Sequence, residues 1–479
     1  MAKLGITNAV HLEAFVTDAE YGGPEARQKL EKKLLLKIDL RMSILVPIYI
    51  LNYKVRNDAA AARARGFEVD LKLKGEEFPT LLSILYIGYI LMQIPSNLFL
   101  NWIGKPSIYL PTCMLVWGLI SVLIGLTSNF AGALVTRFFL GIVEAPFFPG
   151  ALFLLSRWYK RDEIGLRMAI LACGNLISNA FGTLLASGIL GSGYQLGHAA
   201  WRWLFYIEGA VTMSVALIAM FVLPDFPETT KWLSPLERKL ALQRLRVEGS
   251  GPGSTSSSAV SIWKDWKIYW FALTLTSLVI ALSFNAFFPT LTDTLGYGET
   301  VSLVLCAPPW IFATAVAFIV SRDSDKTRER FFHIVIPLAG GMAGFVIALS
   351  TMNTVARYIA LFLMAQTYAG YIVLLAWISN TFIRSAKERA VAIAFINGFS
   401  QLGNIAGSYV WPKIWGPTYR NSYAIAISTT GLVIIMALIM KVHLSSVNKQ
   451  LDSEGDGRGW CDMEKGDPRP WDREFRYIT

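Results

Sequence analysis

The sequence contains few charged residues, few cysteines and few histidines. Only 16% of its 479 residues are charged, whereas a soluble globular protein contains about 25%. The four cysteines include no CxxC spacing and the four histidines form no cluster, so neither a disulfide framework nor a zinc site is indicated. No Ser-His-Asp, metal-binding or phosphate-binding constellation can be assembled either. We therefore expect no cofactor and no metal, and we do not expect an enzyme.

The net charge of +10 does not indicate nucleic-acid binding. Such binding needs Lys and Arg gathered on one soluble face, whereas here many of them lie in short segments between apolar stretches. The chain begins with about 40 mostly polar residues, including a helix-like run at 28–37. We therefore expect no cleavable signal peptide.

Long apolar stretches dominate the rest of the sequence, in which 54% of the residues are hydrophobic. Their length of about 20 residues fits membrane-spanning helices, because a barrel strand needs only about 10 residues of alternating character. The chain is therefore predicted to be an all-α polytopic membrane protein that lies in the lipid bilayer. The twelve predicted transmembrane helices are 41–65, 78–101, 107–126, 130–154, 165–190, 202–223, 267–289, 301–321, 332–351, 355–382, 389–412 and 421–442.

The spans fall into two groups of six on either side of a polar loop at 224–266. We predict an N-terminal tail at 1–40, six-helix halves at 41–223 and 267–442, and a C-terminal tail at 443–479. An even number of spans places both termini on one side of the membrane. Because Lys and Arg concentrate in the tails, the central loop and the short loops on that side, both termini are expected to be cytoplasmic.

A weak internal repeat relates the two groups of spans. Arg167-Met-Ala-Ile and Arg389-Ala-Val-Ala-Ile occupy corresponding loops of the two groups. This match, combined with six spans on each side, indicates two pseudo-symmetric halves with a cavity between them near the membrane midplane.

Ionisable side chains inside the predicted spans are the first candidate functional residues, because a charge at the bilayer centre costs at least about 2.5 kcal/mol. Arg137, Gly141 and Glu144 are spaced i, i+4, i+7 and share one helical stripe. This stripe fits either an ion pair that locks the bundle or a relay with a protonatable carboxyl group. Arg56 is the candidate for binding an anion, since a guanidinium group pairs bidentately with a carboxylate; the alternative is a juxtamembrane arginine beside Lys54.

Amide and aromatic side chains form the second group of candidates. Asn397, Gln401, Asn404 and Ser408 make one polar stripe on an apolar helix, which fits substrate contact and interhelical hydrogen bonding equally well. Several other side chains could line a pocket or simply pack. The full set of expected substrate-binding residues is Arg56, Asn57, Tyr89, Gln93, Arg137, Asn285, Trp377, Asn397 and Gln401.

Six motifs stand out along the chain: KIDLR at 37–41, IGYILMQIPSN at 87–97, RFFLGIVEA at 137–145, WRWLF at 201–205, LPDFP at 223–227 and AWISN at 376–380. They resemble motifs of the major facilitator superfamily, and in particular of the fungal allantoate permease branch of the anion:cation symporter family. The likeness extends from about Leu36 to Leu444. It implies the twelve-helix fold of that superfamily and uptake of a small organic anion, such as allantoate, nicotinate, pantothenate or a related carboxylate, together with protons across the plasma membrane.

The resemblance also assigns roles to individual residues. The Asp-Arg pair of the family's first span corresponds to Val55-Arg56 here, so the arginine is kept and the acid is replaced. Asp58 lies about 60° around the helix from Val55 and could supply the missing carboxylate. Glu144 matches the family's fourth-span acid, so Glu144 and Asp58 are the expected proton-coupling residues.

A loop motif of the superfamily survives in the second half, where Asp325, Arg328 and Arg330 are expected to form a cytoplasmic gate. The alternative is that these three are ordinary charged residues of a cytoplasmic loop with no role in gating. The first half has only Gly104-Lys105-Pro106 at the corresponding place and lacks the acid.

Together these features predict a secondary active transporter that works by alternating access, with an organic anion and protons as its partners and a monomer as its expected state. In this interpretation Arg56 recruits the substrate carboxylate and Glu144 takes up a proton. Two alternatives remain open from the sequence. One is a proton-independent uniporter or exporter of a pathway metabolite, which the replacement by Val55 favours, and the other is a non-transporting nutrient receptor.

Overall fold

The computed structural model describes residues 18–63, 65–191, 197–230, 232–247, 261–382 and 386–457, and these residues form helices and no strand. The all-α prediction is confirmed. The first half contains α2 (Pro24–Met42), α3 (Leu45–Arg63), α4 (Phe67–Asp70), α5 (Glu77–Ile103), α6 (Pro106–Gly125), α7 (Phe130–Glu144), α8 (Phe147–Ser156), α9 (Arg161–Gly191), α10 (Ala200–Val222) and α11 (Pro235–Val247). The second half contains α12 (Trp266–Ala281), the 3-10 helix η3 (Leu282–Phe287), α13 (Phe288–Asp293), α14 (Glu299–Thr327), α15 (Phe331–Ser350), α16 (Thr354–Ala365), α17 (Thr367–Thr381), α18 (Ala386–Ser408) and α19 (Arg420–Gly457).

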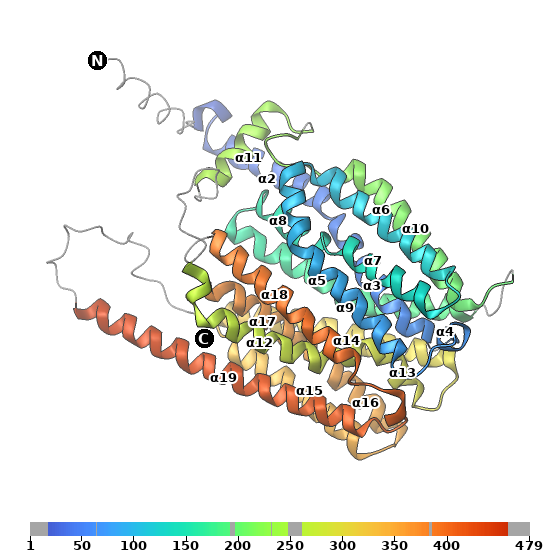
Figure 1. Ribbon diagram of the computed structural model, residues 1–479. Helices are drawn as coiled ribbons and strands as arrows, with labels where there is room; N and C mark the ends of the chain where they lie inside the picture. Colours follow the sequence, from blue (N-terminus) through green and yellow to red (C-terminus); the bar gives the residue numbers. More distant parts are fainter. Residues whose placement is uncertain are drawn as a thin grey trace.

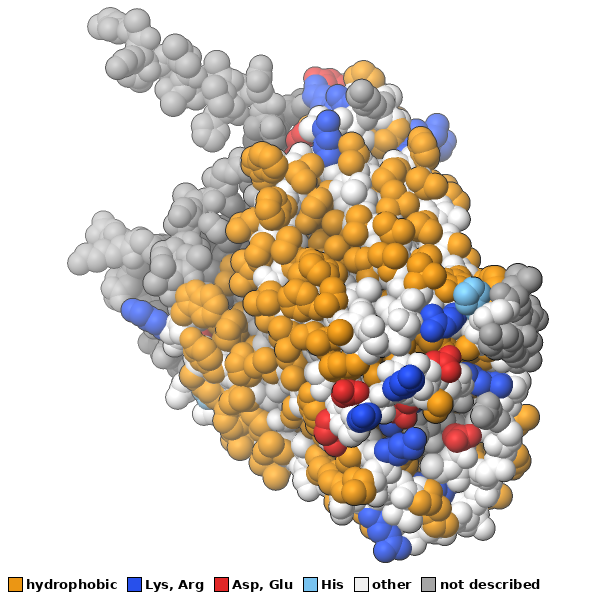
Figure 2. Space-filling model, turned by 45° about the vertical axis from the view of Figure 1, so that its right-hand side comes forward, with side chains coloured by type: hydrophobic (Ala, Val, Ile, Leu, Met, Phe, Trp, Pro, Cys, Tyr) orange, Lys and Arg blue, Asp and Glu red, His pale blue; other side chains and the backbone are white. Residues whose placement is uncertain are grey.

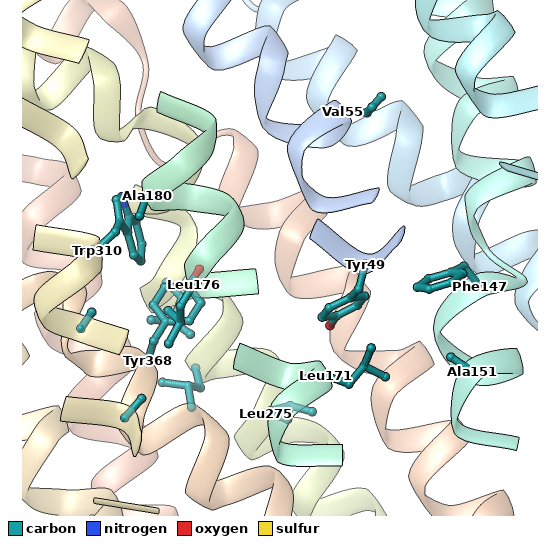
Figure 3. Packing of buried hydrophobic residues seen from close by; sticks show 14 of the residues in the cluster. Tyr49, Val55, Phe147, Ala151, Leu171, Leu176, Ala180, Leu275, Trp310 and Tyr368 are labelled. Atoms are coloured by element: carbon teal, nitrogen blue, oxygen red, sulfur yellow. The ribbon is translucent and has the colours of Figure 1, made fainter. Parts of the chain in front are cut away.

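The two halves lie side by side, with the helices coloured blue to green next to those coloured yellow to red (Figure 1). They meet where α9 packs against α14 and α5 packs against α18. Figure 3 shows one such contact, in which Trp310 of α14 lies beside Ala180 of α9. The helices α2 and α11 lie together at one end of the bundle, which we call the α2/α11 end, and the opposite end carries α4 and is called the α4 end.

The outer surface is apolar between these two ends. Figure 2 shows charged side chains gathered at the ends and hydrophobic side chains over the stretch between them. Within the described residues, ten helices or consecutive helix pairs are long and apolar enough to cross a membrane. The other two predicted spans correspond to α3 and α18, which carry charged and amide side chains along their length. This arrangement is typical of a polytopic bundle in which the more polar helices line an interior cavity.

Three predicted spans are broken into shorter helices. The span 130–154 consists of α7 and α8, because Pro146 lacks a backbone N–H and disfavours helical geometry in the residue before it. The span 355–382 consists of α16 and α17, and the span 267–289 contains the 3-10 helix η3 between α12 and α13. As a result of the first break, Glu144 is the last residue of α7.

Glycines bring α5 and α7 into close backbone contact. A Cβ atom on Gly141 of α7 would lie 1.9 Å from the carbonyl oxygen of Leu85 in α5, and a Cβ on Gly88 would lie 2.3 Å from that of Phe138. Only glycine fits at such distances. Because Gly141 lies between Arg137 and Glu144 in the sequence, this contact fixes both charged side chains against the first half's interior.

Ion pairs attach α2 and α11 to the first half at the α2/α11 end. Arg244 of α11 is almost fully buried between Glu31 of α2, at 2.7 Å, and Glu163 of α9. Lys37 of α2 binds Glu237 of α11 at 2.5 Å. The helix α2 confirms the helix-like run predicted at 28–37, and its ion pairs place it firmly on the first half.

Candidate functional site

A cavity of about 370 Å³ lies between the two halves. The first half contributes residues of α3, α5, α7, α8 and α9 to its wall, and the second half contributes residues of α12, η3, α14, α17 and α18. The wall is rich in side chains that form hydrogen bonds. Its tyrosines are Tyr49, Tyr53, Tyr86, Tyr89, Tyr368 and Tyr371, and its asparagines are Asn52, Asn57, Asn175, Asn285, Asn380, Asn397 and Asn404.

The cavity reaches solvent at the α2/α11 end. Its wall there includes Asp325, whose side chain is 68% exposed. At the α4 end the halves are joined by hydrogen bonds, since the Tyr409 hydroxyl of the second half lies 3.1 Å from Thr80 Oγ1 and 3.4 Å from Ser83 Oγ in the first. The halves therefore part toward the α2/α11 end and close toward the α4 end.

Most of the residues expected from the sequence to bind substrate line this cavity. Two do not: Trp377 is fully buried and packs edge-on against Phe271, with ring centroids 5.6 Å apart, and Gln93 lies against Gly398 at the α5/α18 contact. Neither is part of the wall that the described residues form. The expected residues that do line it are Arg56, Asn57, Tyr89, Arg137, Asn285, Asn397 and Gln401.

Arg56 of α3 is paired with a protein acid and is still reachable from the cavity. Its Nε donates a hydrogen bond to Glu144 Oε2 at 2.5 Å, and its guanidinium carbon lies 4.6 Å from the centre of the Tyr89 ring. The side chain is 9% exposed and forms part of the cavity wall. The stripe on α7 is therefore linked to α3, because Glu144 forms its ion pair with Arg56.

Arg137 of α7 is buried next to this pair and is under-satisfied. Its Nη1 donates to the backbone carbonyl oxygen of Arg56 at 3.4 Å, while its Nε and Nη2 have no hydrogen-bond partner among the described residues. A buried charged donor without a partner is costly. Since Arg137 also lines the cavity, the described wall carries two guanidinium groups next to each other, of which only that of Arg56 forms an ion pair with Glu144.

Asp58, the other expected proton-coupling residue, does not line the large cavity. It pairs with Lys54 one turn earlier in α3 at 3.0 Å, and Lys54 also forms an ion pair with Glu208 of α10. Lys54 was expected only as a neighbour of Arg56, and Glu208 was not among the predicted site residues. The signal was present, because Glu208 is an acid within the predicted span 202–223.

The polar stripe of α18 faces the cavity with all four of its side chains. Its hydrogen bonds run along its own helix: Asn404 Nδ2 donates to Gln401 Oε1 at 2.9 Å, and Ser408 Oγ donates to the Asn404 carbonyl at 2.8 Å. Both roles expected for this stripe therefore stay predictions.

The three residues expected to form a gate contact one another only in part. Arg330 donates to Asp325 at 2.7 Å and to Ser324 Oγ at 2.9 Å, so both charges are held within the second half. Arg328 ends α14 in the left-handed conformation, with φ 52°, and is exposed. Asp325 and Arg330 line the mouth of the cavity, whereas Arg328 lies outside it.

Comparison with known proteins identifies the family. The sequence profile of the Major Facilitator Superfamily matches residues 42–408. The chain is 33% identical to the MFS-type transporter cnsO of Penicillium expansum over 93% of its own length and 90% of that protein. It is 28% identical to a protein named putative tartrate transporter from Agrobacterium vitis, over 86% of this chain and 95% of the relative.

Solved structures share the fold at low sequence identity. A bacterial homologue of the human lysosomal transporter Spinster, in an inward-facing and occupied conformation, superimposes with a TM-score of 0.63 at 16% identity, covering 83% of this chain and 94% of that one. A D-xylose-proton symporter gives a TM-score of 0.63 at 14% identity, covering 82% and 96%. The chain is a transporter rather than an enzyme, and it belongs to the Major Facilitator Superfamily.

Proposed function

We propose that this protein takes up a small organic anion with a carboxylate group, coupled to protons, as a member of the anion:cation symporter family close to its allantoate permease branch. The observation that carries the proposal is the excess of positive charge at the cavity wall. Arg56 and Arg137 both line the cavity, and of the two only Arg56 forms an ion pair with a carboxylate, that of Glu144, in the described structure.

An incoming carboxylate would complete this arrangement. The Nε and Nη2 groups of Arg137 are buried donors that have no partner in the described structure, and a guanidinium group binds a carboxylate through two parallel hydrogen bonds. The tyrosine rings around Arg56 would pack against the uncharged part of the substrate. The name of the Agrobacterium vitis relative, which refers to a dicarboxylate, agrees with this class of substrate.

The proton would be carried by a buried carboxyl group of the same charge network. Glu144 and Asp58 are the two candidates chosen from the sequence, and both are buried, with side chains 0% and 2% exposed. A carboxyl group in such a place can bind a proton when the surrounding charge changes. Uptake then follows if the α4 end faces outward and the α2/α11 end, with both termini, faces the cytoplasm of a cell whose plasma membrane holds the protein.

Uptake of radiolabelled carboxylates by cells that express the chain tests this proposal. Allantoate, nicotinate, pantothenate and tartrate would each be offered at pH 5 and pH 7.5. We expect at least one to be taken up, faster at pH 5, and Arg137→Gln to raise its KM at least about tenfold, because a hydrogen bond to a charged group contributes about 1.5–3 kcal/mol.

The matched control is Arg322→Gln, which removes an exposed arginine at the end of α14 outside the cavity and should leave KM unchanged. Uptake that does not depend on pH would favour the uniporter instead. If Arg56→Gln and Arg137→Gln both leave KM at the wild-type value, the substrate is not recognised as an anion.

A further inference from the structure

Around the middle of α3 the first half encloses three cations and three acids, which balance in number but are not evenly distributed. The cations are Lys54, Arg56 and Arg137, and the acids are Asp58, Glu144 and Glu208. On the cavity side lie the guanidinium groups of Arg56 and Arg137, and Glu144 forms an ion pair with the first of them. On the side toward α10, one ammonium group, that of Lys54, serves two carboxylates.

The side toward α10 has one acid too many for its only cation. The Lys54, Asp58 and Glu208 side chains are 4%, 2% and 2% exposed. Asp58 Oδ2 and Glu208 Oε2 are buried and have no hydrogen-bond partner within the described part of the chain. Two ionised carboxylates that share one ammonium group in a dry site repel each other, and a single proton held between them relieves this repulsion.

A small chamber lies between this cluster and the large cavity. The chamber measures about 30 Å³ and is lined by Lys54 and Asp58, which is room for about one water molecule. Asn57, Ala60 and Asn285 line both the chamber and the large cavity, so the wall between them is one residue thick. Asn57 Nδ2 donates to Asn179 Oδ1 at 2.7 Å beside the chamber.

We propose that the coupling proton binds to the Asp58–Glu208 pair bridged by Lys54, and that Glu144 stays ionised as the counter-ion of Arg56 and Arg137. This inference rests on the proposed function and assigns its proton. A water molecule in the chamber delivers the proton to a carboxylate oxygen of the pair, and the same carboxylate returns it to water when the site empties. Lys54 lines the chamber as a cation, which disfavours a metal ion there.

The charges on the two sides explain how anion and proton are coupled. When the protein is empty, the cavity side carries one excess positive charge and the α10 side one excess negative charge. The substrate carboxylate neutralises the first and the proton neutralises the second. Either ligand alone leaves a buried net charge next to apolar helices, so both sides are neutral only when both ligands are bound.

Charged groups face the pair from two helices. Lys54 and Arg56 lie on α3, and Arg137 and Glu144 lie on α7, where the Arg137 charge interacts with Asp58 as well as with Glu144. Tyr86 of α5 also interacts with Arg137. The chamber walls from α9, η3, α13 and α14 are uncharged, at Ser178, Asn179, Thr183, Asn285, Phe288 and Trp310.

Infrared difference spectroscopy of the purified full-length protein in lipid tests this assignment as the pH is lowered, with no organic anion added. A protonated carboxyl group has a carbonyl stretching band that an ionised one lacks. We expect the wild type to gain such a band from a buried carboxyl group. Because one proton is shared, Asp58→Asn and Glu208→Gln should each remove the band, whereas Glu144→Gln should keep it.

Loss of the band in Glu144→Gln alone, or no titrating band in the wild type, would overturn the assignment. Replacing K⁺ by Na⁺ at constant pH should leave the band unchanged, and its disappearance would mean that the pair binds a metal cation instead. If Asp58→Asn does not fold, Glu208→Gln decides the question by itself. The infrared experiment contains no substrate, so its result does not depend on whether the substrate is an anion. The uptake experiment likewise tests anion recognition without depending on which carboxyl group binds the proton.

Discussion

At the scale of single residues, Lys54 is the buried cation that holds two acids at once. Replacing it by Met would leave Asp58 and Glu208 buried without a counter-ion, and removing one partner of a buried ion pair costs about 3–5 kcal/mol. We expect Lys54→Met to lower the unfolding temperature of the purified protein markedly. Thermal unfolding measured by light scattering or tryptophan fluorescence would show it.

The control for Lys54→Met is the triple variant that adds Asp58→Asn and Glu208→Gln. It has no unpaired charge at this site, so most of the lost stability should return. Wild-type stability of the single variant would show that Lys54 is not the counter-ion of the two acids.

The sequence predicted the charged residues of the site better than it predicted their partners. The rule that a charge inside a span faces a cavity or a partner selected Arg56, Arg137 and Glu144, and all three are buried together. It left open that Glu144 binds Arg56, because that contact depends on how α3 is rotated against α7. The expectation that a charge inside a span has a partner also holds for Glu208, which was not among the predicted site residues.

At the scale of helices, the contact between α5 and α7 positions the cavity's cations. Gly141→Ala would place a Cβ 1.9 Å from a backbone oxygen, so the two helices must separate. We expect a loss of about 1–3 kcal/mol in unfolding free energy, as in other overpacked cores, and slower uptake because Arg137 and Glu144 move. Thermal unfolding and uptake assays measure the two effects.

Gly431→Ala in α19 is the matched control, since a Cβ there meets nothing within 4 Å. Alanine has the higher helix propensity, so this variant should be as stable as the wild type or slightly more stable. Equal unfolding temperatures and equal uptake rates for Gly141→Ala and Gly431→Ala would mean that α5 and α7 separate easily.

The attachment of α2 should weaken in acid. Burial raises the pKa of Glu31, but its hydrogen bonds and charge interactions with Lys160 and Arg244 outweigh burial and lower that pKa overall. A lowered pKa in the folded state stabilises the contact above the ordinary glutamate pKa of about 4.3, and this stability is lost as pH falls through the lower folded-state pKa. The protection factors of the backbone amides of residues 24–42, which correct for the slower intrinsic exchange in acid, should therefore decrease as the pH drops below about 4.

Arg244→Gln should lower the protection factors of the same amides at neutral pH, because it removes the buried partner of Glu31. Lys239→Gln serves as the control. Its ion pair with Glu20 is about half exposed on both sides, and such surface pairs contribute little. Protection of α2 that is independent of both changes would show that apolar contacts hold the helix.

Helix existence was predictable here, and helix continuity was not. Runs of about 20 apolar residues located the predicted spans, including those that became α6, α10 and α15. The break at Pro146 was not predicted, because a hydropathy count registers how apolar a segment is and not whether each residue can donate a backbone hydrogen bond. The break at Gln366 has another origin, since the Gln366 N–H donates to the Phe362 carbonyl oxygen at 3.2 Å.

At the scale of the whole molecule, contacts between the halves at the α4 end hold the observed state. Tyr409→Phe would remove the hydrogen bonds to Thr80 and Ser83, which together contribute about 1 kcal/mol or more, a factor of about five in an equilibrium. We expect a larger population that opens at the α4 end. Distances between spin labels at Lys72→Cys and Ile414→Cys, in a chain without its own cysteines, would measure this shift.

Tyr358→Phe provides the matched comparison, because it removes a tyrosine hydrogen bond, to the Leu305 carbonyl oxygen at 3.3 Å, that lies within the second half. Its label distances should match those of the parent chain. The sequence predicted two halves around a cavity, but it could not predict which end is open, since the same apolar pattern serves both states of a rocking bundle.

The balance of charges around α3 also determines how the membrane voltage acts on transport. A monocarboxylate that crosses with one proton carries no net charge, so the voltage neither drives nor opposes it, whereas a single unbalanced charge experiences about 2.3 kcal/mol per 100 mV. A depolarised cell would still fill itself with such a cargo as long as its surroundings stayed acidic. A doubly charged cargo that crosses with one proton would carry one net negative charge against the resting voltage, so its accumulation would need a second proton.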